Sequence, residues 1–297
     1  MAETIYDTKF ISTNIYLDFK DVLILPKKSN LNSRKEVVLE RTIVFQNGVS
    51  WTGIPIVAAN MTSIGTLDVY KVLSTYKIIT ALHKFHTLQD LQNYNKENSD
   101  SKLNPDFFMI STGISDDDYK NLKTILDNFE CKFICIDIAN GYISKFNEFC
   151  KVLRSKYPKK IIVAGNVCTY EGVNMLNDLE IDIHKVGIGG GSACTTRIQT
   201  GIGMPQLSCI LECVEECYNY NASNFNISYE YDNNTNYRTS EGRELKVPYR
   251  GALKNTIENY LGGLRSSCTY TNSANLQDLA HNTKFISVNN QYNSSLL

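Results

Sequence analysis

The stretch GIGGGSACTTRIQTGIG, residues 187–203, holds one cysteine, Cys194, directly after a glycine cluster. A cysteine that serves only for packing needs no such setting, because buried thiols behave as small hydrophobic side chains on helices and strands. A nucleophilic cysteine does need it, since glycines let backbone N–H and C=O groups come close to a ligand. The stretch therefore predicts a loop that presents the Cys194 thiol to a bound substrate.

Three further cysteines, Cys209, Cys213 and Cys217, recur every four residues in LSCILECVEEC. A helix would place them on one face, which is compatible with a metal site or with half-buried packing thiols, and we prefer packing. The N-terminus, MAETIYDTKFISTNIYLDFK, lacks the basic flank and apolar run of a secretion signal. The nine cysteines are therefore expected to stay reduced in a cytoplasmic protein.

Length and charge limit the class of protein. A chain of 297 residues can form one large domain or two ordinary ones with a sizeable core. A net charge of −1 without a basic block argues against nucleic acid or an anionic membrane as the main partner. No apolar run approaches the ~20 residues that a membrane-spanning helix needs.

Short β-branched runs alternate with longer amphipathic segments, as in successive βα units over a parallel sheet. Polar or glycine residues end nearly every run. Functional residues at the carboxyl ends of many parallel strands are typical of a (β/α)₈ barrel. A doubly wound sheet would concentrate such residues at one switch point, so we favour the TIM-type barrel. The predicted strands are residues 54–61, 77–84, 107–113, 132–140, 160–167 and 183–191.

The strand pattern stops at six. Residues 219–236 hold seven asparagines, so 218–236 is predicted to be an Asn/Tyr-rich connector. Beyond it we expect a loop, a Pro-Tyr turn, a helix that ends at the pair Gly262–Gly263, and a C-terminal tail. The fold prediction is one α/β domain over 1–297, a TIM (β/α)₈-type barrel with about six of its eight strands.

The loop and its flanks, VGIGGGSACTTRIQTGIGMPQLSCILEC, resemble the catalytic loop of the guanosine monophosphate (GMP) reductases in the inosine monophosphate (IMP) dehydrogenase/GMP reductase family, whose fold is a (β/α)₈ barrel. Other matches follow in the family's order: LDFKDVLILPKKSNLNSR, IPIVAANM, ALHKFH, FICIDIANGY, AGNV, RTSEG and VPYRGALKNTIENYLGGLRSSCTY. Thr195, Thr196 and Arg197 after the cysteine, and the absence of an inserted domain after ALHKFH, favour reductase over IMP dehydrogenase, which remains an alternative.

The resemblance implies covalent chemistry, which divides a difficult displacement into two easier steps. In the family reaction a cysteine thiolate attacks C2 of GMP, ammonia leaves, NADPH delivers a hydride to C2, and IMP is released. Cys194 matches the nucleophile, and Thr196 with Glu241 match the pair that handles the proton on the departing ammonia. The family also implies a potassium ion, held by backbone carbonyls at positions that match Gly189, Gly191, Cys194 and Arg197.

The same resemblance assigns the other contacts. The matched nicotinamide-cofactor positions within one subunit are Lys84, Asp137, Ile138, Ala139, Tyr237 and Arg238. The cofactor positions that the family completes across a subunit boundary are Ser33, Arg34, Ser266, Ser267, Cys268 and Thr269, which implies a homo-oligomer, a tetramer. The GMP positions are Arg238, Thr239, Ser240, Glu241 and Gly242.

One segment of the family pattern is missing. Only 47 positions separate Cys194 from Glu241, where the family places two more βα units of ~30 residues each. These units carry the seventh and eighth strands, whose loops bind the nucleotide phosphate in such barrels. Two functions therefore stay open: a GMP reductase, which we rank first, or a catalytically impaired member that acts as a non-catalytic partner of full-length subunits.

Overall fold

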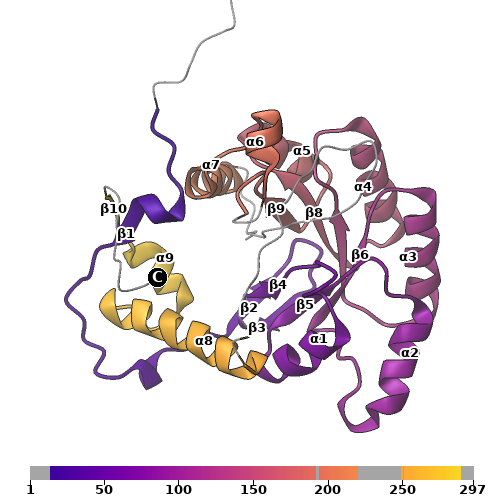
Figure 1. The fold of residues 1–297 in the computed structure, drawn as a ribbon, viewed down its shortest axis with the longest axis horizontal. Helices are drawn as coiled ribbons and strands as arrows, with labels where there is room; N and C mark the ends of the chain where they lie inside the picture. The colour runs from indigo at the N-terminus through magenta and orange to yellow at the C-terminus, as the bar shows by residue number, and fades with distance from the viewer. Residues whose placement is uncertain (1–13, 192–193, 220–248, 250, 289–297) are drawn as a thin grey trace, which may run out of the picture.

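The structure, a computed structural model, describes residues 14–191, 194–219, 249 and 251–288. Its centre is a sheet of six parallel strands in which each strand pairs with the next along the chain (Figure 1). All six predicted strands are confirmed, and together they form a half-barrel that matches an incomplete TIM barrel. The strands are β4 (Val57–Ala58), β5 (Ile79–Leu82), β6 (Phe108–Thr112), β7 (Phe133–Asp137), β8 (Ile161–Val167) and β9 (Ile183–Val186).

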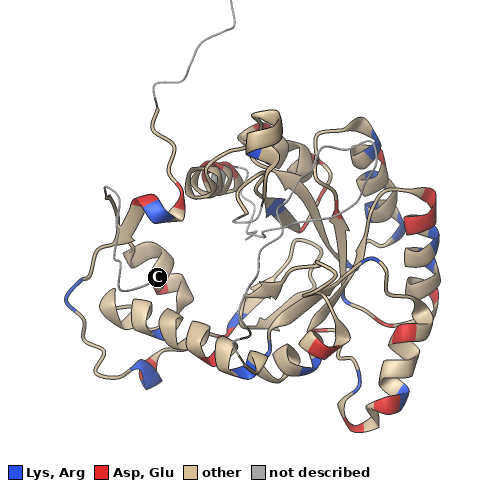
Figure 2. Cartoon of the chain, viewed as in Figure 1, with Lys and Arg blue, Asp and Glu red and all other residues tan. Residues whose placement is uncertain are grey.

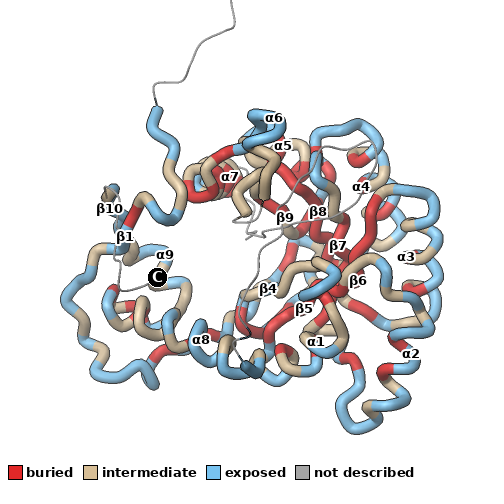
Figure 3. Tube along the Cα trace, in the orientation of Figure 1, coloured by how far each residue is buried: buried red, intermediate tan, exposed pale blue. Residues whose placement is uncertain are grey.

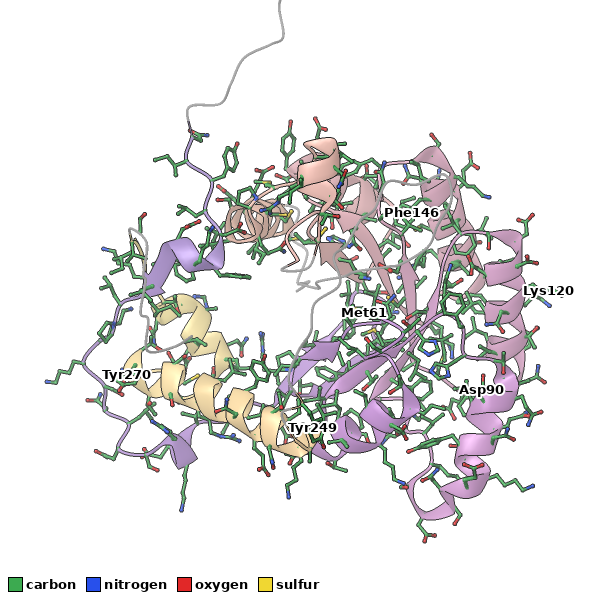
Figure 4. The ribbon with its side chains drawn as sticks, in the orientation of Figure 1. Met61, Asp90, Lys120, Phe146, Tyr249 and Tyr270 are labelled. Atoms are coloured by element: carbon green, nitrogen blue, oxygen red, sulfur yellow. The ribbon has the colours of Figure 1, made fainter. Side chains whose placement is uncertain are left out.

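Helices cover the outer face of the sheet (Figure 3). Every residue of β5, β6 and β8 is buried, as expected of parallel strands covered on both faces. Figure 4 shows Phe146 turned toward the sheet and Lys120 pointing outward, and charged residues gather on the outer helices (Figure 2). These helices are α1 (Leu67–Leu73), α2 (Leu88–Glu97), α3 (Asp116–Asn128), α4 (Ser144–Lys156) and α5 (Tyr170–Asp178).

A hairpin that the sequence analysis did not predict closes the amino-terminal side of the half-barrel. It consists of β2 (Arg41–Val44) and β3 (Ser50–Gly53), joined by a turn in which Gly48 has φ +78°. Trp51 and Phe45 of this hairpin pack against inward side chains of the sheet, and Trp51 Nε1 donates to Asp106 O (2.8 Å). The hairpin therefore forms the floor of the inner core, which is the cluster of buried apolar side chains on the inner face of the sheet.

A second lobe brings the two ends of the described chain together. β1 (Val22–Ile24) pairs antiparallel with β10 (Phe285–Ser287), next to α8 (Leu253–Tyr270) and α9 (Leu276–Asn282). The predicted helix end at Gly262–Gly263 is wrong, because α8 continues to Tyr270. Glycine costs a helix about 1 kcal/mol, and burial of Leu261 and Cys268 on either side of the pair offsets this cost.

The predicted cysteine helix is confirmed as α7 (Gln206–Asn219), which follows the short helix α6 (Thr196–Thr200). Its three cysteines are fully buried rather than half-buried, because α7 packs on α5 and β9. Within the described ranges no group of three or more His, Cys, Asp or Glu side chains could hold a metal ion. The predicted connector, 218–236, is wrong at Tyr218 and Asn219, which belong to α7, and its remainder, 220–236, lies outside the described residues.

No helix in the described part of the chain is long and apolar enough to cross a membrane.

Replacing the chain's one tryptophan tests the floor of the inner core. Trp51 is 3% exposed, so Trp51→Ala should lower the free energy of unfolding by about 3–5 kcal/mol. Val44→Ala on the same hairpin is the control, since Val44 is 60% exposed and should change stability by less than about 0.5 kcal/mol. Urea unfolding followed by circular dichroism measures both. Equal effects would show that the hairpin does not serve as the floor.

A buried histidine joins β9 to α7. His184 is 1% exposed, with Nε2 at 3.2 Å from Ile181 O and Nδ1 at 3.8 Å from Cys217 Sγ. Burial lowers the pKa of His184 from 6.5 to about 4. Below pH 6.5 the unfolded chain therefore binds a proton that the folded chain does not, so this contribution to stability is complete above pH 6.5 and is lost as the pH falls toward 4.

The free energy of unfolding should accordingly fall between pH 7 and pH 5 by about 1–2 kcal/mol more in the wild-type protein than in His184→Gln. Urea titrations at the two pH values measure the difference. His281→Gln, which removes an exposed histidine of α9, should keep the wild-type pH dependence. The same dependence in His184→Gln would contradict the lowered pKa.

Candidate active site

Polar side chains gather where the parallel strands end. The carboxyl ends of parallel strands meet at the same edge of a sheet, so residues that end different strands lie near one another. Asn60 follows β4, Asp137 ends β7, and Lys185 lies on β9. This edge, named here the carboxyl edge, carries the charged part of the candidate site.

Asn60, Asp137 and Lys185 form a closed hydrogen-bonded set. Asn60 Nδ2 donates to Asp137 Oδ2 (3.0 Å), Lys185 Nζ donates to Asn60 Oδ1 (3.1 Å), and Lys185 also pairs with Asp137 Oδ1. The Lys185 side chain is 4% exposed and that of Asp137 is 15% exposed. Such a pair is retained because each charge satisfies the other, since an unpaired buried charge is very costly.

Strand β8, which lies between β7 and β9, explains how the Asp137–Lys185 pair forms. Asp137 lies opposite Gly165 of β8, and Gly165 lies opposite Lys185 of β9. A Cβ on Gly165 would lie 2.4 Å from Lys185 O, so no other residue fits at this register. Because glycine has no side chain, Lys185 reaches Asp137 across the intervening strand.

Of Asn60, Asp137 and Lys185, only Asp137 is among the site residues predicted from the sequence. The sequence signal for Lys185 was a lysine within the predicted strand that begins IHKV. Lysine is almost never fully buried unless it is paired. A lysine in a predicted barrel strand therefore indicates a partner on a neighbouring strand.

Asn166, the residue after Gly165, contributes a buried acceptor. It is 7% exposed, and its Oδ1 has no hydrogen-bond partner among the described residues. Its backbone N–H donates to Ile138 O (2.9 Å) and its carbonyl accepts from Gly141 N (2.9 Å), so the strand end is firmly held. An unsatisfied buried amide costs about 1–3 kcal/mol, which a ligand with an N–H donor would recover. Of the predicted cofactor residues beside it, Ile138 is half-buried and Ala139 is exposed.

The glycine-rich stretch leaves β9 as a loop, as predicted. Gly187 has φ +134° and Gly189 has φ +75°, values that strongly favour glycine. The loop brings together two of the three predicted catalytic residues, since the Cys194 thiol donates to Thr196 Oγ1 (3.2 Å). The third, Glu241, lies outside the described residues, as do Tyr237, Arg238, Thr239, Ser240 and Gly242.

The other cysteines provide a contrast with Cys194. Within the described residues, only Cys194 and Cys168 are not fully buried. Burial raises the pKa of Cys131 to about 11, of Cys150 to about 12 and of Cys217 to about 11. These thiols stay protonated at neutral pH and are poor nucleophiles, because the thiolate is the reactive form. Exposure leaves Cys194 and Cys168 as candidates, and because burial also raises the pKa of Cys168, Cys194 is the better candidate for the reactive thiol.

The four predicted potassium positions, Gly189, Gly191, Cys194 and Arg197, lie between the end of β9 and the first turn of α6. Gly191 O accepts from Cys194 N (3.0 Å), and Arg197 O accepts from Gly201 N (3.0 Å). A carbonyl oxygen has two lone pairs, so each of these two keeps one for a cation. The residues present thus fit an ion held by backbone oxygens.

Lys84, a predicted cofactor residue, follows β5 at the same edge. Its Nζ lies 3.4 Å from Asp118 Oδ1 and over the ring of Phe85, 5.5 Å from the centroid. Asp118 also caps the start of α3 by accepting from the backbone N–H and the hydroxyl of Ser115. The Lys84 ammonium is thus held at the beginning of α3, with a side chain 35% exposed.

The predicted cross-subunit residues lie on the second lobe, well apart from α6 (Figure 1). Ser33 and Arg34 are exposed at η2 (Arg34–Glu36), which packs against α8. Cys268 is fully buried, so a ligand could reach only its backbone or its neighbours. The hydroxyls of Ser266, Ser267 and Thr269 donate to carbonyls of α8. Within one chain these residues do not join the Cys194 loop.

Comparison with known proteins agrees with this arrangement. The "IMP dehydrogenase / GMP reductase domain" matches residues 16–227 and 220–294. GMP reductase 1 of Homo sapiens is 36% identical over 342 aligned positions, covering 96% of this chain and 98% of the relative. GMP reductase of Yersinia pestis (strain Pestoides F) is 37% identical, with 95% and 98% covered. The crystal structure of inosine 5' monophosphate dehydrogenase from Legionella pneumophila is similar at a TM-score of 0.72 and 25% identity, covering 93% of this chain and 99% of that one.

The alignment also locates a difference. It extends over 342 positions although this chain has 297 residues, so several dozen positions of the human relative have no counterpart here. The two matched blocks of the family domain meet at residues 220–227, directly after α7. A glycine-rich loop that carries Cys194, six strands in sequence order and matches along nearly the whole chain point the same way: the chain belongs to the IMP dehydrogenase/GMP reductase family.

Proposed function

We propose that this chain is a GMP reductase, which uses NADPH to convert GMP to IMP and ammonia through a thioimidate on Cys194. The observation that carries the proposal is the contact between the Cys194 thiol and the Thr196 hydroxyl on a glycine-rich loop beside the carboxyl edge. The relatives reported above support reductase over dehydrogenase, since both curated ones are GMP reductases.

The proposed chemistry follows from the residues of the loop. The Cys194 thiolate attacks C2 of the purine, the bond from C2 to the exocyclic amine breaks, and the amine leaves as ammonia after accepting a proton. Thr196 lies within hydrogen-bond distance of the sulfur and relays that proton with Glu241. The later transfer of hydride to C2 breaks the carbon–sulfur bond and returns the thiolate.

The carboxyl edge fits the cofactor. The unsatisfied Oδ1 of Asn166 can accept from an amide such as that of nicotinamide, and the Asp137–Lys185 pair fixes a charged wall beside it. Lys84 and the exposed Arg34 are suited to phosphate, Arg34 from the second lobe of a neighbouring subunit in a tetramer. NADPH, when bound, supplies the hydride. Potassium on the carbonyls of Gly189, Gly191, Cys194 and Arg197 would order the loop.

A second function, that of a non-catalytic partner of full-length subunits, is favoured by the positions of the human relative that have no counterpart in this chain. A chain that keeps Ser33, Arg34 and α8 but lacks the phosphate-binding units can complete the cofactor site of a full-length neighbour without turning over GMP itself. Native mass spectrometry of this chain mixed with a complete homologue distinguishes the two cases. Mixed oligomers together with an inactive homomer would support the partner function over the reductase.

The reductase proposal is tested by the loss of NADPH absorbance in the presence of GMP. Cys194→Ala should lower the rate by about a thousandfold or more, because removal of a covalent nucleophile leaves only the binding contributions. Cys168→Ala is the matched control, since Cys168 is the other half-buried cysteine of the described chain, and it should keep the wild-type rate. Turnover that persists in Cys194→Ala would exclude the covalent mechanism.

The missing units predict weak nucleotide binding. Charge-assisted hydrogen bonds contribute about 1.5–3 kcal/mol each, so loss of two or three phosphate contacts should weaken GMP binding by about a hundredfold or more. Protection of Cys194 against iodoacetamide, followed by peptide mass spectrometry, measures this. GMP should fail to protect Cys194 at concentrations that protect the matching cysteine of a complete homologue. Equal protection would show that another segment rebuilds the phosphate site.

A further inference from the structure

A carboxylate from the beginning of the described chain contacts both α6 and α7, the two helices that follow Cys194. Asp18 Oδ2 accepts from Arg197 Nη1 (3.1 Å), and Asp18 Oδ1 accepts from the backbone N–H of Gln206. These partners are 179 and 188 residues away in sequence. Arg197 lies in α6, three residues after Cys194, and Gln206 begins α7. One side chain thus connects α6 to α7.

Arg197 is the centre of the loop's own packing. Its side chain lies between two glycines, where a Cβ on Gly189 would be 2.9 Å and a Cβ on Gly203 would be 2.7 Å from Arg197 Cγ. Its Nη2 donates to Met204 O, while its Nε is buried without a partner among the described residues. The guanidinium therefore joins the arm before Cys194 to the arm after α6, with Asp18 as its carboxylate partner.

The other Asp18 contact extends the connection to the sheet. A helix leaves its first N–H groups without intrahelical acceptors, and Asp18 satisfies that of Gln206 at the start of the 14-residue helix α7. The Gln206 side chain, 1% exposed, donates to Val186 O (2.9 Å) and fills the space beside Gly187. The contacts run from Asp18 through α7 back to the residue at which the loop leaves β9.

Asp18 is itself fixed by its neighbour. Leu17 N donates to Ser208 Oγ (2.8 Å), and Ser208 N donates to Leu17 O (3.1 Å). These two bonds align the chain at Leu17–Asp18 with the first turn of α7. The carboxylate is therefore held in position before it meets Arg197.

We propose that Asp18 is a positioning residue for the Cys194 loop, acting through Arg197 and the start of α7 to fix where the thiol lies. The role in catalysis rests on the proposed function, whereas the effect on the loop does not. A merely structural carboxylate would affect the whole domain equally. A positioning carboxylate would affect residues 187–205 and the reactivity of Cys194 while the sheet stays unchanged.

The test uses the full chain and four variants. Asp18→Asn keeps the shape but cannot accept from both Arg197 and Gln206, and Asp18→Glu restores the carboxylate on a longer side chain. Ser208→Ala removes one of the two bonds that hold Leu17, the one to Ser208 Oγ, without altering either charged group. Asp127→Asn is the control, because Asp127 forms an exposed pair with Lys123 within α3 (3.0 Å) and connects no separate elements.

Two measurements that need neither GMP nor NADPH are made on each variant. Hydrogen exchange of peptides covering 187–205 should be about tenfold faster or more in Asp18→Asn, as expected for loss of a charge-assisted hydrogen bond. The rate of Cys194 alkylation by iodoacetamide should change at least about threefold in the same variant. Ser208→Ala should change both in the same direction, Asp18→Glu should return toward wild type, and Asp127→Asn should not differ from wild type.

Three outcomes would overturn the proposal: unchanged exchange in 187–205, faster exchange that spreads equally to β6 and β7, or faster loop exchange with an unchanged alkylation rate. Because neither measurement involves turnover, an inactive wild-type chain would count against the reductase proposal alone.

Discussion

The ion pair between Lys185 and Asp137 depends on a single register, and the carboxyl edge depends on that pair. β7, β8 and β9 must align so that Gly165 lies between the two charges. A shift of one residue would turn Lys185 toward the helices and place a side chain where the lysine now passes. An unpaired charge would then be buried, which costs several kcal/mol. The register of three apolar strands is thus fixed by the same residues that form the charged wall of the site.

The strands were predictable because a parallel sheet covered on both faces requires continuous apolar runs, and β5, β6 and β8 are such runs. The hairpin at 41–53 had a signal, Asn47–Gly48 between two short β-rich runs, but only the tertiary contact of Trp51 with the sheet identifies it as the floor. The predicted end of α8 was wrong because the free energy that two glycines cost a helix is smaller than the gain from burying Leu261 and Cys268. Cys194 and Asp137 could be selected as candidate site residues from the sequence. Lys185 and Asn60 could not be paired with Asp137 before the strand order was known.

The half-barrel is stabilised by parts that lie outside the βα units. In the described chain β4 and β9 are the edges of the six-stranded sheet, and an open edge exposes unpaired backbone groups. The hairpin covers one end of the inner core, and the second lobe packs against α1 and the first strands through Leu73, Ile78 and Leu261. These additions let six strands bury a continuous outer core and a separate inner core, so the carboxyl edge and the Cys194 loop keep their support although several dozen positions of the human relative have no counterpart.

The parts of the family site differ in what they depend on. The thiol, the Thr196 hydroxyl and the charged wall are positioned by β7, β8, β9 and α7, all of which the chain has. Phosphate binding in barrels of this type commonly depends on the loops after the last two strands, which the proposed function assigns to the positions of the human relative that have no counterpart here. In the proposed reductase, chemistry at the purine ring and affinity for the nucleotide would therefore rest on different strands. In the proposed reductase the Cys194 thiol keeps its position while the nucleotide is bound weakly, and a neighbouring subunit that supplies affinity would be the simplest way to restore turnover.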